Sequence, residues 1–147
     1  MLSGLPMHPL IVHLTVVGIP VVALLVMYAA LRPGWHVKHP WLVSIATLLA
    51  TISAAITNST GEELLVLKGA SEHDPGIYGD HANKAKIVMI SAAVMLVLML
   101  VYHFLQVKKQ IPALAIAVRG LTVLAAIAAI VGVVLAGHAG ALLVWTQ

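Results

Sequence analysis

Four histidines are the residues of this chain best suited to chemistry: His8, His13, His81 and His138. They lie at the ends of apolar stretches long enough to cross a bilayer, and four spans bring those ends to one membrane face. An ionisable ring in or beside a lipid-spanning helix is costly unless it faces the interior or has a partner, so such rings mark functional sites. The chain has no cysteine, which excludes thiolate metal sites, cysteine-ligated iron–sulfur clusters and covalently attached haem.

A non-covalent, b-type haem is the first ligand that fits these histidines. It needs two neutral imidazoles from facing helices at one depth, among apolar and small side chains. His138 precedes Trp145 by seven residues, which places it about 10 Å below that interfacial ring, and His13 lies about one and a half turns inside its helix. The pair His13 and His138 therefore satisfies the requirement best. His8 and His81 are then second ligands, propionate partners or substitutes for that pair.

A transition-metal ion is the alternative ligand. The same four imidazoles, together with the carboxylate of Glu62 or Glu63, suit zinc, copper or iron, because imidazole binds all three. His8 and His13 are separated by about 140° around a helix axis, so they cannot form a zincin-like pair. Spacing does not separate haem from an ion, which could be bound or transported. A third hypothesis is that the histidines only form hydrogen bonds, in a non-catalytic subunit or assembly factor of a membrane complex.

The other four histidines are predicted to have ordinary roles. His36 and His39 fall in the first loop, His73 in a polar loop, and His103 near the end of the third apolar stretch. A histidine at such a position can extend its ring to water at little cost. We therefore expect solvated or interfacial side chains here.

Composition identifies the elements that must position the site. Hydrophobic residues make up 61% of the 147 residues and charged residues 9%, whereas soluble domains are about half apolar and a quarter charged. The chain is therefore predicted to be an integral membrane protein, with the lipid bilayer as its surroundings. The net charge of +3 comes from scattered loop residues and does not indicate nucleic-acid binding. We predict one all-α transmembrane domain over residues 1–147, an up-down-up-down four-helix bundle.

Four segments satisfy the requirement of about 20 apolar residues per span. The second is expected to stop at the polar run Asn58–Gly61, and the third to begin near His81. Gly132, Ala136 and Gly140 recur at four-residue spacing in the last segment, which predicts a close helix–helix seam or room for a flat cofactor. The predicted spans are residues 8–31, 41–60, 84–107 and 112–145.

Basic residues predict the orientation. The first and third loops share one face with Arg119, and the termini share the other face with the second loop. The first face carries Arg32, Lys38, Lys108, Lys109 and Arg119, and the second carries Lys68, Lys84 and Lys86. The positive-inside rule places the first face in the cytoplasm. We therefore predict a multi-pass protein of the cell (inner) membrane with both termini outside.

Three stretches resemble a known family. The opening GLPMHPLIVHL at residues 4–14, the entry to the third span with His81, and the closing GHAGALLVW at residues 137–145 resemble the DUF2231 family of predicted bacterial four-helix membrane proteins. The similarity covers nearly the whole chain, although Thr15 stands where the family often has a proline. Some members look fused to Rieske-type ferredoxin domains, so the resemblance implies haem and electron transfer.

The residues and the resemblance together predict a small membrane cytochrome of the b type. Its haem lies near the outer face, and it carries electrons to or from a redox protein or a quinone, as a carrier more than an enzyme. A second copy of the chain is a further candidate partner.

Overall fold

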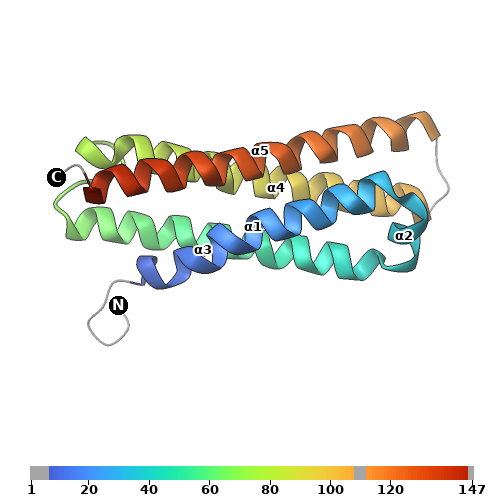
Figure 1. Cartoon of the computed structure of the whole chain (residues 1–147), viewed down its shortest axis with the longest axis horizontal. Coiled ribbons are helices and arrows are strands. Elements are labelled where there is room, and N and C mark those ends of the chain that lie inside the picture. The colour runs from blue at the N-terminus through green and yellow to red at the C-terminus, as the bar shows by residue number, and fades with distance from the viewer. Residues whose placement is uncertain (1–6, 108–111, 146–147) are drawn as a thin grey trace.

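The computed structural model describes residues 7–107 and 112–145, and every regular element within them is helical. Two short helices, α2 (Pro33–Lys38) and the 3-10 turn η1 (Gly76–Tyr78), lie in the connections. Each of the four longer helices is long and apolar enough to cross a membrane, which confirms the prediction of an all-α protein with four spans. Those helices are α1 (His8–Leu31), α3 (Pro40–Leu67), α4 (Gly79–Val107) and α5 (Pro112–Trp145) (Figure 1).

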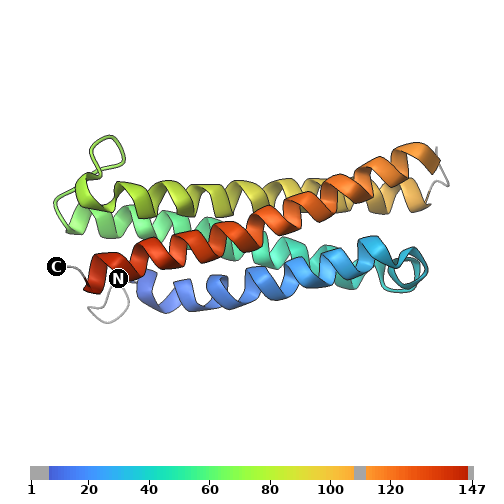
Figure 2. The ribbon, with the colours of Figure 1, turned by 45° about the horizontal axis from the view of Figure 1, so that its top comes forward.

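The four long helices form an elongated bundle. Helices α1 and α4 both pack against α3 and α5, so α1 and α4 face each other across the bundle. Figures 1 and 2 show both ends of the chain at one end of the bundle and α2 at the other. We call the first the terminal end, where α1 and α4 begin and α3 and α5 end, and the second the α2 end. The terminal end thus gathers the first residues of two diagonal helices.

Alanine and hydroxyl side chains make up much of the interior of the bundle, together with larger apolar residues such as Ile19 and Met95. Ala23, Ala126 and Ala129 are fully buried, whereas Leu14 and Val17 are exposed on the outside. A lipid-facing surface is as apolar as the core, so helices in a bilayer associate through close packing and hydrogen bonds. One hydroxyl cluster links α1 to α3 in this way. In it the Oγ1 atom of Thr15 lies 2.6 Å from both Ser53 Oγ and Thr57 Oγ1.

Helix α3 continues past the predicted stop, so the expectation that it ends at residues 58–61 is wrong. The polar side chains there form hydrogen bonds along the helix instead of ending it. Asn58 Nδ2 donates to Glu62 Oε1 at 2.6 Å, and Thr60 Oγ1 donates to the Ile56 carbonyl at 2.9 Å. Helix α4 likewise starts earlier than expected, at Gly79. The predicted end of the third span at Lys108 and Lys109 lies outside the described residues.

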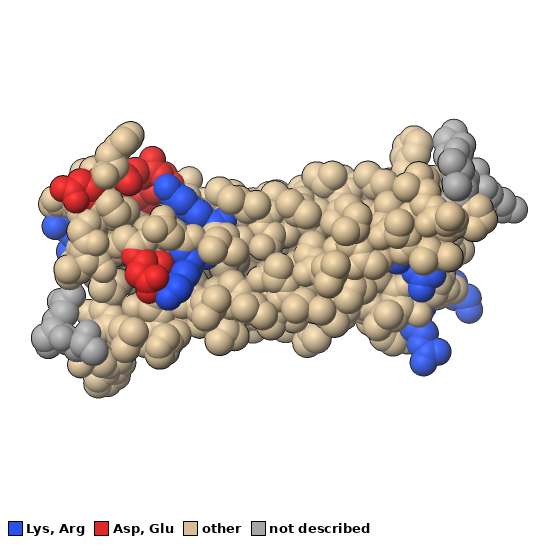
Figure 3. Space-filling model, turned by 90° about the horizontal axis from the view of Figure 1, so that it is seen from above, with Lys and Arg blue, Asp and Glu red and all other residues tan. Residues whose placement is uncertain are grey.

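Charged side chains divide between the two ends. All the carboxylates of the sequence lie between residues 62 and 80, at the terminal end, and the face drawn in Figure 3 has acidic side chains at that end only. Lys84 and Lys86 form ion pairs there with Asp80, at 2.6 Å, and Glu72, at 2.9 Å. The long middle of the surface in Figure 3 carries no charge, as a membrane-crossing surface requires.

Candidate functional site

His8 and His81 meet at the terminal end of the bundle. His8 is the first residue of α1 and His81 lies in the first turn of α4, so the two rings approach from diagonal helices. Their centroids are 6.3 Å apart and their planes are nearly perpendicular, at 86°. Both side chains are half-buried. The structure therefore brings together two of the four predicted site histidines.

Hydrogen bonds to neighbouring helices fix both rings. The Nδ1 atom of His8 lies 3.0 Å from the carbonyl oxygen of Thr57 in α3, and that of His81 lies 2.9 Å from the carbonyl oxygen of Ala136 in α5. A carbonyl can only accept, so each Nδ1 carries a hydrogen, and Nε2 is the nitrogen that can supply a lone pair to a ligand. Metal-binding histidines have this arrangement, in which one nitrogen donates to a carbonyl or carboxylate and the other binds the metal.

A glycine lies against each of the two rings. A Cβ atom on Gly61 would lie 3.2 Å from Cε1 of His8, and a Cβ atom on Gly140 would lie 3.1 Å from Nδ1 and Cε1 of His81. Both distances are shorter than ordinary contacts, so any larger residue would displace the ring. Gly61 belongs to the run that the sequence suggested as a helix stop. Its role is to leave space for His8.

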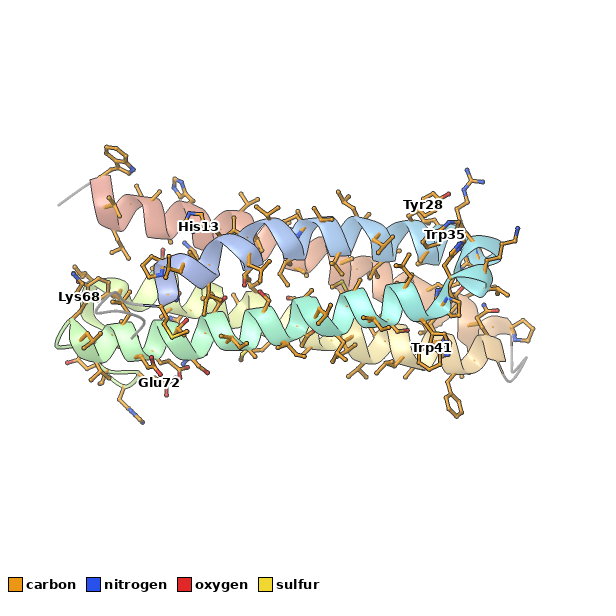
Figure 4. All side chains as sticks on the ribbon, turned by 90° about the horizontal axis from the view of Figure 1, so that it is seen from below. His13, Tyr28, Trp35, Trp41, Lys68 and Glu72 are labelled. Atoms are coloured by element: carbon orange, nitrogen blue, oxygen red, sulfur yellow. The ribbon has the colours of Figure 1, made fainter. Side chains whose placement is uncertain are left out.

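A cavity of about 410 Å³ opens beside the two imidazoles. Small-molecule and cofactor sites have volumes of about 300–1,000 Å³. The lining is mainly apolar, with Glu62, Lys68, Glu72 and Lys86 among its polar residues, and Figure 4 shows Lys68 and Glu72 at this end. The Lys86 ammonium holds the pKa of the Glu72 carboxyl below its usual value. A second cavity of about 60 Å³ touches the same two histidines from the interior of the bundle.

His13 and His138 lie on the outside of the bundle, contrary to the predicted interior pair. Both side chains are exposed, and Nδ1 of His13 lies 2.7 Å from the carbonyl oxygen of Pro9 on its own helix. Helix geometry explains the difference. His13 is turned by about 140° from His8, and His138 by about 160° from Ala136, whose carbonyl binds His81. Because His8 and Ala136 face inward, the other two residues face outward.

The predicted ion site is not assembled either. Glu62 lines the cavity, but its Oε1 atom accepts a hydrogen bond from Asn58, and Glu63 is exposed. Within residues 7–107 and 112–145, no three His, Asp or Glu side chains form a group that could hold a metal ion. The terminal end thus offers two imidazoles and a cavity.

The sequence was compared with known families and proteins. A family model described as a predicted membrane protein, DUF2231, matches residues 4–147. The chain belongs to the DUF2231 family. No curated protein and no solved structure matches it. The resemblance seen in the opening and closing motifs is therefore confirmed, and the DUF2231 description establishes a membrane protein without assigning an activity.

This DUF2231 protein has a second histidine cluster, at the α2 end, which was not predicted from the sequence. His36 is fully buried, so the expectation of a solvated or interfacial side chain is wrong. Its ring stacks on Tyr102, with centroids 4.7 Å apart, and lies 6.1 Å from the ring of His103 at 86°. Trp41 packs against His103, and Figure 4 shows Trp41 and Trp35 at this end. Counting residues along the first loop and the third span places His36 and His103 at similar depths in the membrane, which could have predicted that the two side chains meet.

Burial controls the ionisation of His36. Desolvation, together with repulsion from His103, lowers the pKa of the His36 imidazole to about 4. The ring is therefore neutral at physiological pH. His39 and His73 are exposed, as their loop positions predicted.

Proposed function

We propose that this protein is a small b-type cytochrome of the cell membrane, in which His8 and His81 would hold a non-covalent haem. The observation that carries the proposal is the pair of neighbouring imidazoles, 6.3 Å apart, each bound through Nδ1 to a backbone carbonyl so that Nε2 remains available as a ligand. Haem bound there would supply one-electron chemistry. The side chains of this site position the ligands and keep the surroundings apolar.

The separation of the two rings suits ligation of one metal. With metal–nitrogen bonds of about 2.0 Å, imidazoles on opposite sides of a metal have their centroids about 6–6.5 Å apart. The rings of His8 and His81 are separated by 6.3 Å. Their anchoring helices, α3 and α5, are different, so each ring is held independently.

The surroundings also suit a flat, largely apolar group with acidic substituents. Gly61 and Gly140 remove side-chain bulk beside the rings, and the cavity of about 410 Å³ has a mainly apolar lining. Lys68, on the lining of that cavity, supplies positive charge for the propionates. Lys86 also lines it and is engaged with Glu72.

The count of protein ligands favours haem over a bare ion in this site. A structural zinc site takes four protein ligands and a catalytic one takes three. The described residues offer two imidazoles here and no third ligand grouped with them. A porphyrin completes the coordination of iron with its own nitrogens, so two protein ligands suffice.

Orientation follows from charge. We propose an up-down-up-down bundle with the α2 end in the cytoplasm, because five of the eight Lys and Arg residues belong to the first and third loops or lie near them in the sequence. Both termini and the site then lie at the outer face. The electron partner is a quinone or a redox protein that reaches this face.

The test is an absorption spectrum of the purified protein from cells supplied with a haem precursor, recorded oxidised and reduced. We expect one haem per chain in the wild type and loss of the haem bands in His8→Ala and His81→Ala. His13→Ala and His138→Ala are matched controls, because they remove an exposed imidazole from the same membrane end. Both controls should keep the wild-type spectrum.

Two results would contradict the proposal. A wild-type protein without haem after haem supply would leave the histidines as hydrogen-bonding residues of a non-catalytic subunit. Loss of haem in His13→Ala and His138→Ala, with retention in His8→Ala and His81→Ala, would restore the pair predicted from the sequence.

A further inference from the structure

The buried polar atoms that have no partner are concentrated at the α2 end. Within the described residues, four buried side-chain nitrogen or oxygen atoms have no hydrogen-bond partner: His36 Nδ1, His36 Nε2, Tyr102 OH and His103 Nδ1. Gln106 lies one turn beyond Tyr102 on α4, close to that hydroxyl. All four atoms belong to the stacked group of His36, Tyr102 and His103.

Such a group needs an explanation. A buried polar atom without a partner destabilises the fold, and native structures rarely leave several together unless water, an ion or a ligand meets them. Here His36 is supplied by α2 and the other two residues by α4, while Trp41 of α3 covers His103. Arg119 is engaged nearby, since its Nε donates to the Ala30 carbonyl at 2.6 Å.

We propose that His36 and His103 bind a divalent transition-metal ion of the Cu²⁺ class, with the Tyr102 hydroxyl as an oxygen donor. The 6.1 Å separation of the two imidazoles suits rings on nearly opposite sides of one metal, as in a square-planar or tetragonal site, and exceeds the separation of about 5 Å expected for a tetrahedral zinc site. Imidazole nitrogen is a preferred ligand of Cu²⁺. This second site is independent of the proposed haem.

Packing selects an ion over a larger group. Both cavities described above lie at the terminal end. At the α2 end, His36 is fully buried against Tyr102 and His103 is packed against Trp41. A bare ion fits between such side chains, whereas a macrocycle requires them to separate.

The test measures metal binding in a His8→Ala, His81→Ala background, where the proposed haem site is removed. The purified, chelator-treated protein is dialysed against Cu²⁺ and its metal content is measured. We expect one ion per chain, and about 100-fold weaker binding after His36→Phe or His103→Phe, because even the loss of a supporting residue costs about 10–100-fold. His39→Phe changes an exposed ring of the same connection and should bind as the background does.

Tyr102→Phe tests the third ligand without disturbing the stacked rings. Binding should weaken about tenfold while the thermal midpoint of the ion-free protein is maintained. The inference is overturned if the background protein binds no ion. It is also overturned if the His36→Phe and His103→Phe proteins are folded and bind the ion as tightly as the background.

Discussion

The two ends of the bundle carry the same pair of side chains in opposite states. Each end has two imidazoles with perpendicular planes and nearly equal spacing, 6.3 Å at the terminal end and 6.1 Å at the α2 end. At the terminal end both rings donate to backbone carbonyls, whereas at the α2 end neither nitrogen of His36 has a partner within the described residues. The first pair is held in place by the fold, and the second needs something else to satisfy it.

Lowering the pH should have the largest effect on this difference between the two histidine pairs. The pKa of His36 is about 4 in the folded protein and 6.5 as the reference value, so the fold favours the neutral ring. The resulting stability is complete above pH 6.5 and is lost as the pH falls towards 4, by up to about 3 kcal/mol. We predict that the thermal midpoint of the metal-free protein falls over this interval.

The control for the acid prediction is the neighbouring exposed histidine. His36→Phe should flatten the pH dependence, and His39→Phe should leave it unchanged. If the His36→Phe protein shows the wild-type slope, burial of His36 is not the origin of the acid sensitivity.

Replacing Gly61 or Gly140 with alanine should weaken ligand binding at the terminal end without affecting the α2 end. Gly61→Ala and Gly140→Ala place a methyl group 3.1–3.2 Å from the His8 and His81 rings, which must then shift. We predict about 10–100-fold weaker haem binding, as for other residues that orient ligands, measured by haem titration. Gly18→Ala is the matched control, because nothing lies within 4 Å of its added methyl and Gly18 does not line the cavity beside the histidines. Equal affinities for all three variants would refute the close fit.

Removing one hydroxyl at each end should have opposite effects on stability. Thr15→Val loses the contacts of Oγ1 with Ser53 and Thr57, and hydrogen bonds between membrane helices are worth about 0.6 kcal/mol on average and up to about 1.7. The thermal midpoint should fall. Tyr102→Phe in the metal-free protein removes a buried hydroxyl without a hydrogen-bond partner, so its midpoint should hold or rise. An equal fall in the thermal midpoint of both variants would show that the Tyr102 hydroxyl forms hydrogen bonds as favourable as those of Thr15.

The surface ion pairs should contribute least. Lys84→Gln removes the exposed pair with Asp80, one turn apart on α4, and such pairs are worth about 0.3–0.5 kcal/mol. We predict a change in thermal midpoint near the limit of detection, and a smaller one in high salt. A large loss would mean that surface charge, and not the buried rings, distinguishes the two ends.

The sequence predicted how far along its helix each residue lies better than which side of the helix faces the interior of the bundle. Hydropathy located the four spans, and counting residues placed His8 and His81 at one end, because the rise along a helix is fixed. Which side of each helix faces inward could not be predicted in the same way. In a soluble protein the apolar face of a helix packs against the core. Here Leu14 faces outward and the buried Thr15 faces inward, because apolar side chains on the outside of the bundle contact lipid favourably.

Two errors follow from that limit. Equal depth predicts His13 and His138 as the pair, but both rings are exposed. Gly61 was interpreted as part of a helix end because its neighbours are polar, whereas those neighbours bond along α3. The signal that could have corrected the choice is the 140° turn between His8 and His13, which allows only one of them to face inward.

The anchoring of the two rings bears on how the protein assembles. His8 is held by α3, the partner of α1 in the first half of the chain, and His81 by α5, the partner of α4 in the second half. Each half therefore carries one ring together with its own support, and the facing pair arises only when the halves dock. The two halves made as separate polypeptides should reconstitute the pair when they are mixed.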